Sequence, residues 1–140
     1  MARPAGEKTR NNGDWTEARF NSFIKSMLRQ GTRRWGPISQ CLKDAKVSRG
    51  MYLCNGCKEE VPVTIKVERK RVKNVLVDHI APIINPETGF TTWDDCINGM
   101  FCETDNLQVL CKDCHDVKSL QERATTAVFR KKRKEQDDKS

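Results

Sequence analysis

A chain of 140 residues, 36% hydrophobic and 32% charged, has the length of one domain and can bury only a modest core. Its net charge of +7 suits a polyanionic partner such as nucleic acid, although a solvated basic surface has the same composition. Residues 1–8 contain no apolar stretch, and no run approaches the ~18 apolar residues of a membrane span, which predicts a cytoplasmic protein without a secretory signal or membrane segment.

The N-terminal part of the chain is predicted to contain an arm and then helices. Residues 1–13 are polar and contain two glycines and a proline, which predicts a disordered arm. Residues 14–50 are predicted to be helical. Asp14 with Glu17 is close to a capping box, apolar residues follow at helical spacing, and Gly31 is a suitable stop. Pro37 suits the first turn of a second, shorter helix.

The remainder mixes strand and helix patterns, so the predicted fold class is α+β. Residues 61–79 alternate and are rich in valine, isoleucine and threonine, which predicts two strands with a basic hairpin turn. Residues 80–90 contain two prolines and a glycine and are predicted to form a loop. A short helix is expected over 91–100, a strand over 107–110, and a helix from about residue 112. Residues 126–140 are expected to be a charged tail, solvated or frayed.

Four of the seven cysteines form two Cys-x-x-Cys pairs, which predicts a zinc site. In the cytoplasm disulfides are rare, and paired cysteines more often bind metal. A two-residue spacing lets each pair present both sulfurs to one tetrahedral zinc ion. The 53 residues between the pairs imply that a subdomain is inserted there; the alternatives are free buried thiols or a zinc ribbon without catalysis. The predicted ligands are Cys54, Cys57, Cys111 and Cys114.

The chain has only two histidines, and each lies in a motif. His79 belongs to Val-Asp-His-Ile (77–80), and His115 ends Asn-Leu-Gln-Val-Leu-Cys-Lys-Asp-Cys-His (106–115). Histidine is the commonest metal ligand among side chains and a general base near neutral pH. Their position beside an aspartate and beside a cysteine pair favours metal chemistry over incidental histidines.

The order strand, loop, strand, helix, with Asp-His, Asn and His at these places, resembles the HNH endonuclease family. The resembling stretch runs from Tyr52 to about Lys118 and includes Cys-Asn-Gly-Cys (54–57) and Val-Asp-His-Ile-Ala-Pro (77–82). The upstream Arg-Arg-Trp-Gly-Pro (33–37) is similar to that of small phage-encoded HNH proteins. The resemblance implies a ββα-metal core over residues 51–125, preceded by N-terminal helices.

Carried over residue by residue, the resemblance assigns roles to four side chains. Asp78 and His115 would hold a catalytic divalent metal, and His79 would be the general base that takes a proton from water. Asn106 would bond backbone across the loop and hold His79 in orientation. Because adjacent strand residues point to opposite faces, Asp78 and His79 can converge only if the backbone bends.

The expected catalytic ion is magnesium or manganese. Some family members have another histidine ligand one helical turn after the position of His115, where this chain has Ser119. Two protein ligands completed by water favour these ions over zinc.

The expected substrate is double-stranded DNA, bound through basic side chains. Contacts to phosphate give affinity without sequence information. The resemblance further implies phage packaging proteins as partners, a role in genome packaging or homing, and the host cytoplasm as location. A zinc-stabilised nucleic-acid-binding module without catalysis is the alternative function, and solvated basic residues are the alternative for each run. The candidate DNA-binding residues are Arg33, Arg34, Lys66, Arg69, Lys70, Arg71, Lys73 and Lys118.

Overall fold

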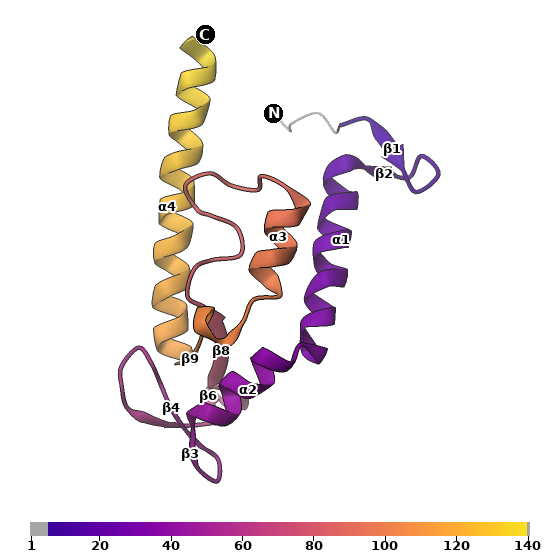
Figure 1. Cartoon of the computed structure of the whole chain (residues 1–140). Coiled ribbons are helices and arrows are strands. Elements are labelled where there is room, and N and C mark those ends of the chain that lie inside the picture. Colours follow the sequence, from indigo (N-terminus) through magenta and orange to yellow (C-terminus); the bar gives the residue numbers. More distant parts are fainter. Residues whose placement is uncertain (1–5, 140) are drawn as a thin grey trace. The chain divides into compact units, whose positions relative to one another are not determined.

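The chain folds as two units, divided between Arg34 and Trp35. The computed structural model describes residues 6–139 and has the predicted α+β class (Figure 1). The first unit contains β1 (Lys8–Arg10), β2 (Trp15–Thr16), α1 (Glu17–Gly31) and the 3-10 turn η1 (Thr32–Arg34). The second helix of the predicted helical segment 14–50 belongs to the other unit.

A short hairpin occupies part of the segment predicted as a disordered arm. β1 pairs with β2 in antiparallel fashion, and residues 1–5 of that arm lie outside the described residues. The turn contains Asn11, Asn12 and Gly13, all with positive φ, a conformation that asparagine and glycine tolerate best. Because the hairpin includes Trp15 and Thr16, α1 begins later than predicted. Thr16 rather than Asp14 is the N-cap, and its Oγ1 accepts from the Arg19 N–H at 3.2 Å. Gly31 is the last residue of the helix rather than the C′ residue that the sequence predicted, and Thr32 is the C-cap.

The second unit contains the two cysteine pairs and both histidines. The predicted strand region 61–79 forms four short strands instead of two, because Val63, a tight turn at Glu68 and the buried Asn74 interrupt it. Its elements are α2 (Gly36–Ala45), β3 (Lys46–Ser48), β4 (Met51–Leu53), β5 (Glu60–Pro62), β6 (Thr64–Val67), β7 (Lys70–Lys73), β8 (Val75–His79), α3 (Trp93–Met100), η2 (Thr104–Asn106), β9 (Leu107–Cys111) and α4 (Lys112–Lys139).

The pairing of β8 with β9 is central to this unit. The two strands are antiparallel and in register from Val75↔Cys111 to His79↔Leu107. Val75 and most of β9 are buried, and Cys54, Cys96 and Met100 complete the described apolar core. β9 continues directly into α4, so two paired strands joined by a loop are followed by a helix (Figure 1).

The predicted frayed tail is helical instead. α4 continues to Lys139, and its last part consists mainly of lysine, arginine and glutamate, which are good helix formers. Arg133 donates to the Glu87 carbonyl, so the loop after β8 is tied to this helix. Most of the charged side chains there are exposed, in agreement with the predicted solvation.

Asn74 is the one buried polar residue among the described core positions, at 5% exposure. Its Nδ2 donates to the Pro62 carbonyl at 2.9 Å, and its Oδ1 accepts from the Lys112 N–H at 3.2 Å. A single amide therefore joins the end of β5 to the first turn of α4.

We predict that Asn74→Ala lowers the free energy of unfolding by about 1–3 kcal/mol, because it leaves a carbonyl and an N–H without their partner. Chemical denaturation at constant zinc concentration measures the change. The control is Asn98→Ala, an exposed position in α3, which should change stability little. Equal stability of the two variants would contradict the role of Asn74.

Candidate functional site

The two cysteine pairs converge, as the sequence predicted. Cys54 follows β4 and Cys57 lies in the turn after it, while Cys111 ends β9 and Cys114 lies in the first turn of α4. Their sulfurs all lie within 4.8 Å of one another. Within residues 6–139 this is the one group of three or more such ligands that can hold a metal ion. Tetrahedral zinc with bonds of about 2.3 Å places its sulfurs about 3.8 Å apart, so the group fits zinc after a slight contraction.

The four thiols differ in how readily they ionise. Burial opposes ionisation of Cys54, yet the N–H groups of Cys111, Cys57 and Gly56 lower its pKa to about 6. The Cys111 N–H lies 3.2 Å from the Cys54 sulfur. The hydrogen bond with Cys111, burial and the neighbouring sulfurs raise the pKa of Cys114 to about 12. Without a cation, mutual repulsion keeps the four thiols from all being thiolates, so a bound metal must displace protons.

Gly56 permits the close approach of the two pairs. A Cβ at this position would lie 2.9 Å from the Cys114 sulfur and 3.0 Å from its Cβ. Any side chain at residue 56 would therefore push a ligand out of place.

A second site lies between β8 and α4. The His115 Nε2 is 3.9 Å from Asp78 Oδ1, so the structure brings the two predicted metal ligands together. The other oxygen of Asp78 accepts from Gln108 Nε2 at 2.9 Å and lies 3.1 Å from Lys118 Nζ. The carboxylate thus has one oxygen facing His115 and one engaged by protein donors.

Lys118 is engaged inside this site. Its ammonium donates to the His79 carbonyl at 3.0 Å and also contacts Asp78 and Glu122. Burial opposes the charge, but the hydrogen bonds to Glu122 and Asp78 raise the pKa of Lys118, which stays protonated at neutral pH. The side chain is 23% exposed. The predicted contact of Lys118 with phosphate would require it to leave these partners.

His79 turns toward a different element from Asp78. β8 keeps its register with β9 through both residues, and the backbone bend follows directly after them, at Ile80 and Ala81. The His79 Nε2 lies 3.0 Å from the Met100 carbonyl at the end of α3. Because a carbonyl only accepts, Nε2 carries the proton and Nδ1 keeps its lone pair in the neutral ring.

Asn106 bonds backbone across the loop, at the place the sequence predicted. Its Oδ1 accepts from the Ala81 N–H at 2.9 Å, and its Nδ2 donates to the Ala81 carbonyl at 3.3 Å. The Ile80 N–H donates to the Asn106 carbonyl at 2.9 Å. The loop is thereby pinned directly after His79, while the influence of Asn106 on the ring of His79 stays a prediction.

Sequence reasoning missed Gln108 and its partner Asn55. Asn55 lies in the first cysteine turn, and its Nδ2 donates to Gln108 Oε1 at 2.8 Å. Gln108 in turn donates to Asp78, its register partner across the strands. A polar residue inside the apolar run Leu-Gln-Val-Leu-Cys was the available signal. Glu122 was also missed, although its spacing of four from Lys118 predicts contact on a helix.

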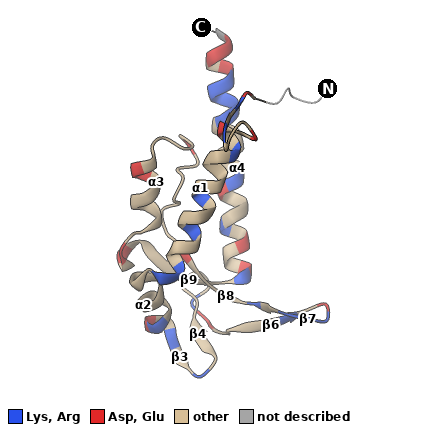
Figure 2. Cartoon of the chain, turned by 90° about the vertical axis from the view of Figure 1, so that its right-hand side faces the viewer, with Lys and Arg blue, Asp and Glu red and all other residues tan. Residues whose placement is uncertain are grey.

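The predicted DNA-binding residues are divided between the two units. Arg33 and Arg34 lie in η1 of the first unit. The remaining ones besides Lys118 lie on the β6–β7 hairpin, where Figure 2 shows a group of basic positions; they are Lys66, Arg69, Lys70, Arg71 and Lys73.

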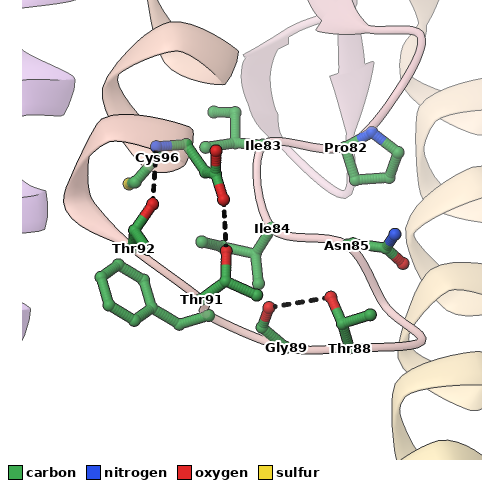
Figure 3. Close-up of a pocket in the computed structure, with 11 residues that line it drawn as sticks. Pro82, Ile83, Ile84, Asn85, Thr88, Gly89, Thr91, Thr92 and Cys96 are labelled. Atoms are coloured by element: carbon green, nitrogen blue, oxygen red, sulfur yellow. Dashed lines mark hydrogen bonds between the residues drawn. The ribbon is translucent and has the colours of Figure 1, made fainter.

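A separate pocket of about 260 Å³ lies between the loop after β8 and α3 (Figure 3). The Thr91 hydroxyl donates to Asp95 Oδ2 at 2.7 Å at its edge. Ile83, Ile84 and Phe90 contribute apolar lining. None of the predicted site residues lines this pocket.

Comparison of the chain with family models, curated proteins and solved structures finds no match. None of the helices in the described part of the chain has an apolar stretch long enough to cross a bilayer.

We predict that purified protein binds one zinc ion and that Cys54→Ser loses both the zinc and the fold. Zinc binding at neutral pH should release protons, because Cys57 and Cys114 have raised pKa values. Zinc affinity should therefore fall as pH falls. Titration calorimetry in buffers of different ionisation enthalpy counts the protons, and zinc binding without proton release would contradict the thiol site.

We predict that Gly56→Ala weakens zinc binding by roughly 10–100-fold, the usual range when ligand orientation is disturbed. Competition with a chromogenic chelator measures the affinity. Gly36→Ala is the matched control, because a Cβ there meets nothing within 4 Å. The same zinc affinity in both variants would show that residue 56 does not limit the approach of Cys114.

Proposed function

We propose that this chain is a metal-dependent endonuclease of the HNH kind that hydrolyses phosphodiester bonds in DNA. The observation that supports it best is the meeting of Asp78 and His115, residues from β8 and α4 that the family resemblance assigned to one metal. A core of two paired strands and a helix joins them. The zinc site stabilises this core and takes no part in the chemistry.

The proposed catalytic metal fits the residues that would hold it. Neighbouring ligands about 2.1 Å from an octahedral ion lie about 3.0 Å apart, so Asp78 and His115, which are 3.9 Å apart, would approach one another to hold it. An imidazole nitrogen and one carboxylate oxygen leave positions for water and phosphate. A divalent ion bound there supplies a positive charge for the phosphate and the leaving oxygen.

His79 is the proposed general base. Its hydrogen bond to the Met100 carbonyl assigns the proton to Nε2, so Nδ1 accepts the proton of the attacking water. Asn106 holds the following backbone through Ala81, which keeps β8 and the loop in place beneath the ring.

Lys118 balances the charge of Asp78 in this proposal. Its ammonium pairs with the oxygen that also accepts from Gln108, and the other oxygen stays directed at His115. The ammonium also competes with a divalent ion for the same carboxylate, which predicts weak metal binding.

One observation favours a second function, a zinc-stabilised nucleic-acid-binding module without catalysis. Asp78 already has a cation, the Lys118 ammonium, at 3.1 Å. In a binding module this ion pair would be purely structural, and no divalent ion would be required.

Plasmid nicking separates the two functions and tests the roles of the histidines. We expect nicking by the wild type with magnesium or manganese, and a loss of ~10²–10⁴-fold in His79→Ala because proton transfer is removed. His115→Ala should also lose activity, but extra manganese should restore part of it. No cation replaces a missing base, so His79→Ala should not be rescued.

The rate is measured against manganese concentration for the three proteins. Equal rescue of both variants would mean that the roles are assigned wrongly. An inactive wild type with every divalent metal would favour the binding module.

Manganese binding to zinc-loaded protein tests the competition by Lys118. Lys118→Met should bind manganese about tenfold more tightly, because it removes a positive charge beside the ligand. Lys112→Met is the matched control, since it removes the same charge from the same helix and Lys112 pairs with Asp116 instead. Paramagnetic resonance of free manganese gives the affinity; unchanged or weaker binding in Lys118→Met would contradict the metal assignment.

A further inference from the structure

The hairpin of β6 and β7 has two chemically different faces. Four residue pairs face each other across its two strands. From the base to the turn they are Thr64↔Lys73, Ile65↔Val72, Lys66↔Arg71 and Val67↔Lys70. Side chains alternate between the faces of a strand. One face therefore carries Thr64, Lys66, Arg71 and Lys73, and the other carries Ile65, Val67, Lys70 and Val72.

Contacts and burial support this division. Arg71 Nη1 donates to Thr64 Oγ1 at 3.2 Å, so the two side chains share a face. Lys66, Arg71 and Lys73 are exposed, and on the other face Ile65 and Val72 are half-buried while Val67 and Lys70, beside the turn, are exposed. We call Lys66, Arg71 and Lys73 the cationic face. Neither strand contains an acidic residue, and Glu68 in the turn is the one carboxylate between Thr64 and Lys73.

The base of the hairpin is fixed to the rest of its unit. The Val63 N–H donates to the Gly50 carbonyl at 2.9 Å, and the Asn74 N–H donates to the Val63 carbonyl at 2.9 Å. Asn74 is also bonded to Pro62 and Lys112. The hairpin projects beyond this base (Figure 2). β8, which carries Asp78 and His79, begins at the next residue, so the hairpin is anchored close in sequence to the candidate site.

We propose that the cationic face docks on the phosphate backbone of double-stranded DNA. The charge is complementary, and a two-stranded ribbon is narrow enough to enter a major groove about 12 Å wide. Lys70 points to the opposite face and takes no part, although it lies on the same strand as Arg71 and Lys73. This inference rests on the proposed function for its choice of DNA, but it requires no cleavage.

Two substitutions on β7 provide the test, because Lys73→Gln and Lys70→Gln remove the same charge from opposite faces. Binding to a fluorescent 20-base-pair duplex is measured by anisotropy at several salt concentrations, in a His79→Ala background so that the duplex stays intact. We expect Lys73→Gln to weaken binding severalfold and to reduce the salt slope by about 0.9, the value for one lost phosphate contact. Lys70→Gln should change affinity less than twofold and leave the slope unchanged.

The double variant Lys66→Gln/Lys73→Gln extends the test and should reduce the slope by about 1.8. Thermal unfolding and zinc content confirm that each variant is folded. Equal effects of Lys70→Gln and Lys73→Gln would overturn the inference, as would equal or tighter binding of the matching single strand. If Lys73→Gln weakens duplex binding and Lys70→Gln does not, the inference holds even when the wild type cleaves no DNA. In that case only the proposed nuclease activity fails.

Discussion

The five-residue register between β8 and β9 is the constraint on which both candidate sites depend. At one end Val75 pairs with Cys111, a member of the thiol cluster, and at the other His79 pairs with Leu107 beside Asn106. Because side chains alternate along a strand, a slip of one residue would turn Asp78 and Gln108 away from α4. The buried side chains of β9 oppose such a slip, since it would expose them to water.

In the proposed nuclease, two kinds of metal chemistry would meet at this strand pair. Four clustered sulfurs suit a soft-ligand ion such as zinc, whereas one carboxylate and one imidazole suit a weakly held ion with water in its remaining positions. Asn55 and Gln108 connect them by hydrogen bonds, from the first cysteine turn to the Asp78 carboxylate. In the proposed nuclease, loss of zinc would therefore disturb the catalytic carboxylate as well as the fold.

Charge is used differently in three parts of the second unit. Lys118 is held between Asp78 and Glu122, and its charge balances the site. The lysines and arginine on one face of the β6–β7 hairpin are exposed and available to an external anion. In α4 the basic residues near the C-terminus mainly support an exposed helix, with Arg133 also binding the loop after β8. Net charge alone does not distinguish these three uses.

The sequence by itself determined the features that depend on local spacing. The presentation of both sulfurs by each cysteine pair and the proline in the first turn of α2 were predicted from neighbouring residues and agree with the structure. The Asn-Asn-Gly turn was equally local and was overlooked, which led to the wrong prediction of disorder at Lys8–Arg10. The helical continuation to Lys139 was missed because a charged run without an apolar face was interpreted as a tail.

Only the tertiary structure decided which distant groups meet. Asn55 contacts Gln108 across 53 residues of sequence, and Lys118 contacts the His79 carbonyl across 39, so no local pattern reports either contact. The side chains of Asp78 and His79 point to different elements, α4 and α3. This too depends on tertiary structure, because the pairing with β9 keeps β8 regular. Local spacing is set by covalent geometry and backbone preference, whereas these contacts are set by strand register and by the packing of α4, both of which involve the whole unit.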